Sequence, residues 1–437
     1  MAQDFAAGDP AAALTQVFPP LHPLLLSLLG PIVGSGNESW WMAGQGLCIF
    51  LGVLSVVLLW RVSALFVTGP ATALVPAIAS FWLAVGMLPA WNAADALSEG
   101  LFLVLMCAWM LAWASDRRWL LSILAGLCFL TRPEGGILFA PLLWLLYRSP
   151  DRAATAGRRW AQGSCMVLAG ALLPLLYLAA KARLSGRFDP LPVGSFMHEL
   201  SVFSQPNPGS MMLAYVHNLL RFLEQGFDGL GYLAYPCFFL ALFGLRSLDA
   251  NQRRRILPLV LVACIACLVA PLFKSNRRFW ISWLPILLPL AARPLARLQS
   301  WRPHARLGGR RALWLLVLVL ALPHLVRLPR QRRGALLADR QLGRWLMAQG
   351  LQPGELAADL PRLLFFADQP PLPPRHLEAA RLMEQAARPQ TRYVASLLGR
   401  GKLDLPRLTK LGYMQRDLGT LLPDALLQRK LVLYSRP

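Results

Sequence analysis

Charged side chains are scarce in this sequence. Asp, Glu, Lys and Arg make up 15% of its 437 residues, whereas a soluble globular protein has about 25%. Acidic residues are fewer than basic residues, at 22 against 44. This composition argues against an ordinary soluble domain, and the 56% of hydrophobic residues points to a membrane protein.

Cysteine and histidine are also few. All seven cysteines lie in or at the edges of apolar runs, so no disulfide framework is predicted. Cys264 and Cys267 form a C-x-x-C inside an apolar segment, where packing is a better interpretation than redox chemistry. The six histidines show no spacing with Cys or carboxylates that is typical of zinc. No metal ligand set is therefore predicted.

The charge that is present is mostly basic. The formal net charge is +22, and only five of the 44 basic residues are lysines. A basic excess of this size is found in nucleic-acid-binding proteins. Here, however, most arginines cluster in short loops between apolar runs, as orientation by anionic lipid predicts. We therefore expect the lipid bilayer as a partner, and no nucleic acid.

Apolar runs near membrane length dominate the first three quarters of the chain. A bilayer has a hydrocarbon core about 30 Å thick, which about 20 helical residues cross. The sequence predicts ten segments, at 41–66, 71–89, 97–115, 119–131, 134–148, 160–180, 229–247, 257–272, 279–295 and 312–326. Residues 41–326 are thus predicted to form an α-helical polytopic membrane domain.

Arginine clusters set the predicted orientation. They follow the third, fifth, seventh and ninth segments, and cytoplasmic loops are the ones rich in Arg and Lys. The opposite loops, predicted to lie outside, are 90–96, 181–228 and 273–278. Residues 1–40 then form an extracytoplasmic loop with a juxtamembrane helix. With this orientation the N-terminal loop lies outside, and a preceding helix is needed to carry it across the membrane. We therefore expect one further helix upstream of Met1.

The tail, residues 327–437, has no membrane-length run. RLLFFAD and KLVLYSR are short apolar runs, and HLEAARLMEQAARP has a helical pattern. Alternation of the two patterns predicts a small soluble α/β domain. Because ten membrane segments are predicted, an even number, this domain lies on the same extracytoplasmic side as residues 1–40.

The region 119–148 is too short for two membrane-crossing helices. Its halves, 119–131 and 134–148, span about 20 and 22 Å, less than the hydrocarbon core. Both ends are basic, so a helical hairpin is predicted, with Arg132 and Glu134 at its tip. Ionisable groups at membrane depth usually mark a site. An Arg–Glu pair that only caps two helix ends is the alternative.

Four phrases of the sequence occur in the order found in GT-C integral-membrane glycosyltransferases. They are FPPLHPLLLSLLGPIVG, ALSEGLFL, LAGLCFLTRPEGGILFAPLLWLL and NRRFWISWLPILLPLAA. More narrowly, they resemble the protein mannosyltransferase and aminoarabinose-transferase-like branch, over residues 1 to about 300. The resemblance implies a GT-C-like helical fold, a polyprenyl-phosphate-sugar donor and a site on the outer face of the membrane.

The resemblance also implies acidic catalytic residues. The second acidic position of the family matches Glu99 in LSEGLF, and Asp95 lies four residues earlier. Such a carboxylate can orient the acceptor, accept a proton or hold a divalent cation. A first-turn acid behind a Ser98 cap is the structural alternative for Glu99. The principal acid of the family would fall before Met1, so the chain resembles a sequence without its first helix and that acid.

Substrate-binding residues follow from the chemistry of the leaving group. A departing lipid phosphate needs fixed cations, and Arg donates two parallel hydrogen bonds to phosphate. The predicted ligands are Lys274, Arg277 and Arg278 at the outer start of a membrane helix, Arg132 and Glu134 at the hairpin tip, and His22 in the outer loop. Interfacial anchoring of the basic cluster and a structural role for the histidine are the alternatives.

These features together predict a glycosyltransferase of the bacterial inner membrane. It would move a sugar from a polyprenyl-phosphate carrier to a cell-envelope glycolipid or protein on the outer face, with the C-terminal domain in the periplasm. A membrane transporter or lipid flippase is the alternative class, and it would show repeats and ionisable groups at mid-bilayer on several helices. A non-catalytic GT-C homologue is a third interpretation.

Overall fold

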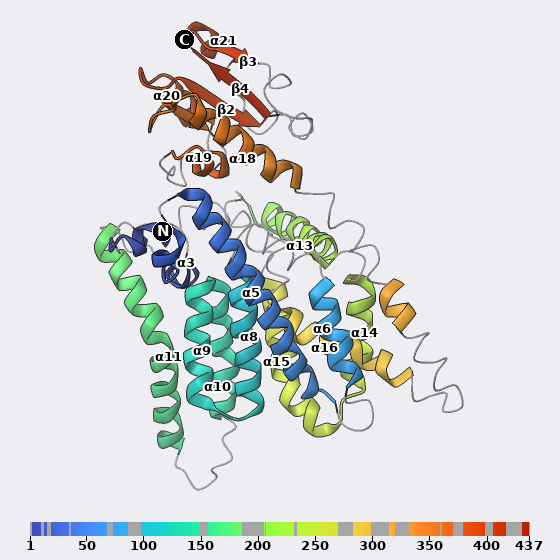
Figure 1. Cartoon of the computed structure of the whole chain (residues 1–437). Helices are drawn as coiled ribbons and strands as arrows, with labels where there is room; N and C mark the ends of the chain where they lie inside the picture. The colour runs from blue at the N-terminus through green and yellow to red at the C-terminus, as the bar shows by residue number, and fades with distance from the viewer. Residues whose placement is uncertain are drawn as a thin grey trace. The chain divides into compact units, whose positions relative to one another are not determined.

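The computed structural model of the chain divides into two compact units (Figure 1). It describes residues 2–9, 13–14, 19–34, 36–67, 73–85, 98–147, 156–185, 205, 207–230, 234–269, 283–298, 314–319, 333–358, 361–369, 379–397, 405–416 and 431–436. The first unit comprises Met1–Val33 and Trp41–Leu325, and the second comprises Gly34–Trp40 and Val326–Pro437. Each unit is described by itself.

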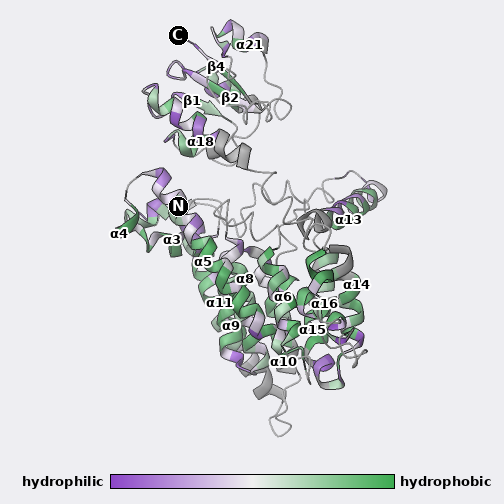
Figure 2. Ribbon diagram, turned by 45° about the vertical axis from the view of Figure 1, so that its right-hand side comes forward, coloured by the Kyte–Doolittle hydropathy of each residue, from purple (hydrophilic) through white to green (hydrophobic). Residues whose placement is uncertain are grey.

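The first unit is a bundle of helices. Its elements are α1 (Ala2–Ala6), α3 (Leu21–Ser27), α4 (Gly30–Val33), α5 (Asn37–Ala64), α6 (Leu74–Val85), α8 (Glu99–Ala114), α9 (Arg118–Thr131), the 3-10 helix η1 (Pro133–Leu138), α10 (Phe139–Tyr147), α11 (Ala156–Ser185), α13 (Pro208–Leu230), α14 (Ala234–Arg246), α15 (Ala250–Val269) and α16 (Leu284–Leu298). Residues 314–319 are also helical. Hydrophobic residues dominate the bundle helices (Figure 2). The predicted α-helical fold class is confirmed.

Among the described residues, two helices are long and apolar enough to cross a membrane by length and composition. They are Asn37–Ala64 and Gly163–Leu184, the latter within α11. Shorter apolar helices accompany them at Leu74–Val85, Glu99–Ala114, Arg118–Thr131 and Glu134–Leu143. One expectation needs correction, because the predicted outer loop 181–228 contains most of helix α13. Its apolar residues follow a helical spacing among polar ones and form no continuous run.

Small residues let two of the helices approach closely. Ser122 and Gly126 lie one turn apart on α9, and they face Gly170 of α11. A methyl group added at Gly126 would overlap the carbonyl of Gly170, and one at Gly170 would overlap that of Ser122. The Ser122 hydroxyl donates a hydrogen bond to the carbonyl of Met166. Small residues and hydroxyl bonds of this kind hold helices together where lipid surrounds them.

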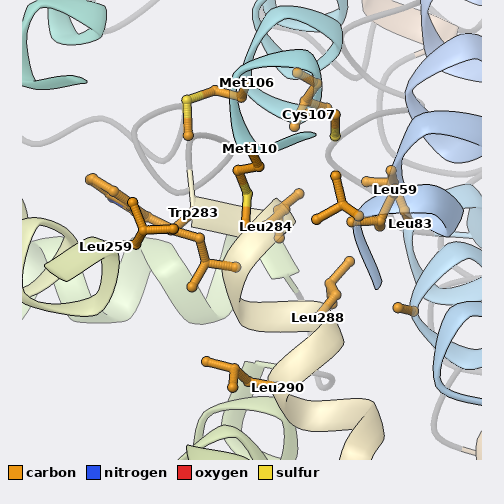
Figure 3. Packing of buried hydrophobic residues seen from close by; sticks show 14 of the residues in the cluster. Leu59, Leu83, Met106, Cys107, Met110, Leu259, Trp283, Leu284, Leu288 and Leu290 are labelled. Atoms are coloured by element: carbon orange, nitrogen blue, oxygen red, sulfur yellow. The ribbon is translucent and has the colours of Figure 1, made fainter. Parts of the chain in front are cut away.

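The core of the bundle lies between α5, α6, α8, α15 and α16. Met106, Cys107 and Met110 of α8 face Leu284 and Leu288 of α16, as Figure 3 shows. Leu59 of α5, Leu83 of α6 and Leu259 of α15 complete this cluster. These side chains are almost fully buried, and their packing fixes α8 in the centre of the bundle.

A buried arginine closes one end of the bundle. Arg293 of α16 donates hydrogen bonds to the carbonyl of Phe66, just past α5, and to the carbonyl of Ser247, just past α14. Its Nε donates to the Ser247 hydroxyl at 2.8 Å. Carbonyls at helix C-termini have no partner within the helix, so a cation there satisfies them and interacts favourably with the helix dipole. Arg293 therefore ties together the ends of three helices.

The second unit is a small α/β domain, as the sequence predicted. Its sheet has the order β1-β2-β4-β3, and only β1 and β2 are parallel. The strands are β1 (Leu356–Ala358), β2 (Tyr393–Leu397), β3 (Met414–Arg416) and β4 (Leu431–Ser435), and the helices are α18 (Arg333–Ala348), α19 (Pro361–Phe366), α20 (Ala379–Ala386) and α21 (Leu405–Lys410). Alternate strand residues face two separate cores, one with α18 and α19 and the other with α20 and α21. The unit is thus a three-layer sandwich.

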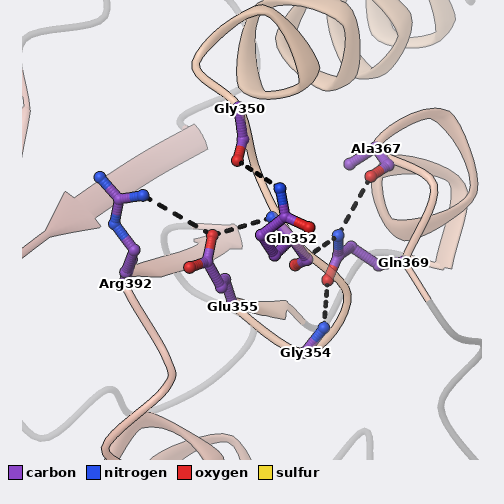
Figure 4. A network of polar contacts seen from close by, with 7 residues as sticks. All are labelled: Gly350, Gln352, Gly354, Glu355, Ala367, Gln369 and Arg392. Atoms are coloured by element: carbon purple, nitrogen blue, oxygen red, sulfur yellow. Dashed lines mark hydrogen bonds and ion pairs between the residues drawn. The ribbon is translucent and has the colours of Figure 1, made fainter.

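A polar network stabilises the turn that leads into β1 (Figure 4). The Gln369 side chain accepts a hydrogen bond from the backbone of Gly354 at 2.8 Å and donates to the carbonyl of Gln352 at 3.1 Å. Glu355 accepts from the backbone of Gln352 and lies 3.8 Å from Arg392. These bonds satisfy the polar groups of a tight turn whose Gly354 has a positive φ of 90°.

The first turn of α5 belongs to the second unit. Glu38 forms ion pairs with Arg340 and Arg344 of α18, the latter at 2.5 Å. The Asn37 amide donates to the Asp368 carboxylate at 2.7 Å and to the carbonyl of Phe365 at 3.0 Å. The contacts of this turn therefore fix the start of α5 against α18 and the end of α19.

Candidate functional site

The site is built around the break between α9 and η1. Thr131 ends α9, and Arg132 is extended, with φ −154° and ψ 132°. Pro133 disfavours helical backbone in the residue before it and is well placed to start the next helical turn. A side chain at Gly135 would overlap the backbone of Cys128 and Phe129, so only glycine permits this tight return. The helix break predicted at this position is confirmed.

Arg132 bridges two carboxylates. Its Nη1 donates to Glu99 Oε1 at 3.0 Å, and its Nη2 donates to Glu134 Oε1 at 2.7 Å. Glu99 and Arg132 are 2% and 9% exposed, so the first of these ion pairs is buried. Buried ion pairs need close geometry to offset the loss of hydration. The arrangement holds the guanidinium and the Glu99 carboxylate in a fixed relationship.

One face of α8 supplies the other side of the site. Glu99 is the first residue of the helix, and Phe102 lies three positions later, on the same face. The Arg132 guanidinium lies 5.9 Å from the centre of the Phe102 ring, within the range of a cation–π interaction. Ser98 is the N-cap residue of α8 without a side-chain capping bond, and Glu99 is the acidic residue of the first turn. Its described ion pair is with Arg132.

His22 approaches the same region through α5. Its Nε2 lies 3.6 Å from the Sγ of Cys48, and both side chains are buried. Gly100, next to Glu99, faces the backbone of Cys48, so the absence of a side chain there brings α8 close to α5. Burial lowers the pKa of His22 to about 4. The imidazole is therefore neutral at physiological pH.

The predicted site residues divide into two groups. Glu99, Arg132 and Glu134 are joined by ion pairs, and His22 contacts Cys48, whose backbone lies beside Gly100. Asp95, Lys274, Arg277 and Arg278 lie outside the described residues. Sequence reasoning missed Phe102 and Cys48. The i, i+3 spacing from Glu99 was the available signal for Phe102, whereas nothing in the sequence pointed to Cys48.

A divalent cation was a further expectation for this region. Within the described ranges, no three His, Cys, Asp or Glu side chains come together as a metal ligand set. At the site itself, Arg132 supplies a positive charge between the two carboxylates. The three charges sum to −1, since two carboxylates flank one guanidinium.

Depth can be calculated along the two helices that carry the site. The basic turn at Arg117 and Arg118 separates α8 from α9. At 1.5 Å per residue, α9 rises about 21 Å from Arg118 to Arg132, and α8 rises about 22 Å from Ala114 to Glu99. The three charges therefore lie at the ends of the two helices that are far from the basic turn.

Comparison with solved structures identifies the fold. ArnT from Cupriavidus metallidurans in the apo state superposes with a TM-score of 0.63 at 14% identity, over 99% of this chain and 91% of that protein. The same enzyme bound to undecaprenyl phosphate gives a TM-score of 0.61 at 14% identity, with the same coverage. No family model and no curated protein matches the sequence.

A second group of similar structures is archaeal. The Archaeoglobus fulgidus oligosaccharyltransferase, in complex with Zn and sulfate, gives a TM-score of 0.56 at 13% identity over 91% of this chain. This chain spans 63% of that protein's length. Both similar proteins are GT-C glycosyltransferases. The chain therefore has the fold of the integral-membrane glycosyltransferases of the GT-C type, as the sequence resemblance predicted.

Proposed function

We propose that this protein is a glycosyltransferase that takes a sugar from a polyprenyl-phosphate carrier. The acceptor is a glycolipid or protein of the cell envelope, on the outer face of a bacterial inner membrane. The observation that carries the proposal is the buried Glu99–Arg132 ion pair, with the partly exposed Glu134 beside it, at the break of a helix within a GT-C fold. The similar ArnT structure contains undecaprenyl phosphate, which supports a polyprenyl-phosphate donor.

The proposed reaction inverts the anomeric carbon. The acceptor hydroxyl oxygen attacks that carbon, the bond between it and the phosphate oxygen breaks, and the carrier leaves as polyprenyl phosphate. The proton of the hydroxyl passes to a carboxylate or to water. Glu99 is the carboxylate that we assign to the acceptor side, because Arg132 fixes its position.

The net charge of the cluster distinguishes the residues that position Glu99 from those that stabilise the departing phosphate. Because Glu99, Arg132 and Glu134 sum to −1, the cluster repels a departing phosphate on balance. We therefore assign Arg132 as a positioning residue that orients Glu99, and Glu134 as the group that holds Arg132 from its other side. Stabilisation of the phosphate is assigned to Lys274, Arg277 and Arg278, which carry a charge of +3. His22, neutral and buried, is assigned to hydrogen bonding with a substrate hydroxyl.

A transfer assay tests the function. The purified chain, reconstituted in lipid vesicles, is supplied with undecaprenyl-phosphate sugars labelled in the sugar, together with bacterial envelope lipid and protein fractions. We expect the label in a glycolipid or protein, with equimolar release of undecaprenyl phosphate. Movement of intact labelled donor across the vesicle membrane, without release of undecaprenyl phosphate, would establish a flippase instead. Neither product nor movement, with donor still bound, would establish a non-catalytic homologue.

A further inference from the structure

Helix α13 exposes an apolar stripe that no described part of the chain covers. Met212, Leu213 and Leu220 are 64%, 70% and 61% exposed, and Val216 and Leu223 are also exposed. Turning 100° per residue places all five within about 100° of one another around the helix. The stripe is therefore a single continuous face along three turns.

The other two faces of α13 differ from the stripe. Phe222 is fully buried, and the Tyr215 hydroxyl donates to the carbonyl of Leu268 at 2.9 Å, so one face packs on the bundle. A narrow polar margin lies beside the stripe, with His217, Arg221 and Glu224 exposed. A helix with a buried, an apolar exposed and a polar exposed face is suited to a boundary between protein, hydrocarbon and water.

The bond to Leu268 also gives the depth of α13. Leu268 lies in the last turn of α15, and Arg254 lies near the other end, where arginines are expected to face the cytoplasm. The helix rises about 21 Å over the 14 residues from Arg254 to Leu268. Because the hydrocarbon core is about 30 Å thick, α13 lies about 10 Å inside its outer boundary. This is the depth at which in-plane amphipathic helices bury their apolar face.

Helix α15, which α13 contacts through Tyr215, also exposes apolar side chains. Leu257, Leu261 and Leu268 on α15 are 42%, 51% and 58% exposed, and these residues are expected to face lipid in a membrane-crossing helix. Figures 1 and 2 both show α13 lying across the end of α14, not along it. Two neighbouring helices of the bundle, α13 and α15, thus each expose an apolar face, and the Tyr215–Leu268 bond joins the two helices.

We propose that α13 is an in-plane membrane helix whose stripe, Met212, Leu213, Val216, Leu220 and Leu223, binds the hydrocarbon chains of outer-leaflet lipids. His217 and Arg221 then lie toward the headgroups. The helix lies at the depth of the Glu99–Arg132 pair, since both are about 20 Å from the basic ends of their helices. The inference rests on the membrane location of the fold and not on the transfer reaction.

Site-directed fluorescence in a full-length, reconstituted chain tests this proposal. Cys165, Cys264 and Cys267, the cysteines that are not buried, are first replaced by serine. Single cysteines introduced by Leu213→Cys and Leu220→Cys are labelled with an environment-sensitive dye. Arg221→Cys, on the polar margin of the same helix, is the matched control. The protein is placed in nanodiscs of phosphatidylcholine and phosphatidylglycerol.

We expect a nitroxide high on a lipid acyl chain to quench both leucine sites at least about twofold more than the Arg221 site. Aqueous iodide should show the reverse order. Iodide quenching of the leucine sites equal to that of Arg221 would overturn the proposal, because water would then cover the stripe. Protection from both quenchers would also overturn it, since another part of the protein would then be the occupant.

A final experiment distinguishes bulk lipid from undecaprenyl phosphate as the ligand of the stripe. Undecaprenyl phosphate added at low mole fraction should leave the fluorescence of both leucine sites unchanged. A saturable change would instead assign the stripe to the carrier and contradict binding of bulk lipid. These results do not depend on turnover, so an inactive protein with quenched leucine sites would reject the proposed function and retain the in-plane helix.

Discussion

Glu99 and Arg132 form a buried ion pair of 3.0 Å, although 33 residues separate them in the chain. The pair joins the start of α8 to the break after α9. Each residue is placed by its own local sequence, the carboxylate by the first turn of a helix and the guanidinium by an extended residue before proline. The pair is the contact on which the assigned acceptor site depends.

Removal of the guanidinium should destabilise the bundle as well as the site. Arg132→Met leaves the buried Glu99 carboxylate without its partner, and loss of one member of a buried pair costs about 3–5 kcal/mol. Chemical unfolding in detergent measures this loss. In the double variant Arg132→Met/Glu99→Gln the added loss should be much smaller, because the charge that needed a partner is gone. Strictly additive effects of the two substitutions would show that the pair is not coupled.

The neutral imidazole of His22 makes stability depend on pH. Its pKa is about 4 in the folded protein against 6.5 for an ordinary histidine. The unfolded chain therefore binds the proton first as pH falls, and stability is lost between pH 6.5 and 4, by about 3 kcal/mol. His22→Asn should flatten the unfolding free energy across that window. A slope that His22→Asn does not change would contradict the assignment of this pH dependence to His22.

The α9–α11 contact should not tolerate a methyl group. Gly126→Ala places its Cβ against the carbonyl of Gly170, so the helices must separate, at a loss of about 1–3 kcal/mol. Gly52→Ala is the matched control, because nothing lies within 4 Å of the added carbon. That control should stabilise α5 slightly, since alanine favours helix over glycine by up to about 1 kcal/mol. Equal melting temperatures of the two variants would contradict the close packing.

Arg293 should be needed for stability and not for catalysis. Arg293→Met removes the hydrogen bond to the carbonyl of Phe66, at about 1–3 kcal/mol for a buried group, whereas the carbonyl of Ser247 keeps a bond from Arg297. The melting temperature should fall, whereas the KM for the donor in the surviving folded protein should not change. Arg254→Met, at an exposed position of the same basic region, should leave both values unchanged. A raised KM with normal stability would assign Arg293 to substrate binding instead.

Local patterns predicted the elements of the site but not their contacts. The proline after Arg132 and the short apolar halves around it predicted the broken helix, and α9, η1 and α10 confirm it. Glu99 and Arg132 were both identified from the sequence as site residues. Their contact was not predicted, because it depends on how α8 packs on α9. Cys48 was missed for the same reason, since its approach depends on Gly100.

Charge counting and hydropathy also have physical limits. Arg293 lies at the end of the ninth predicted segment, next to an arginine-rich loop, yet it is a buried residue of α16. A count of basic residues near a membrane boundary does not distinguish an arginine in water from one that satisfies helix ends. Helix α13 was assigned to a loop because its apolar side chains alternate with polar ones. A search for helical spacing, in place of continuous apolar length, would have found it.

We propose that Arg132 fixes Glu99 for transfer of a sugar from a polyprenyl-phosphate carrier. The decisive measurement is the initial rate of that transfer by Glu99→Gln, in vesicles, beside Glu224→Gln, an exposed control. We expect kcat to fall about 10²–10⁴-fold for Glu99→Gln, with unchanged binding of undecaprenyl phosphate and a normal rate for Glu224→Gln. A normal kcat for a folded Glu99→Gln variant would show that Glu99 has no part in the transfer.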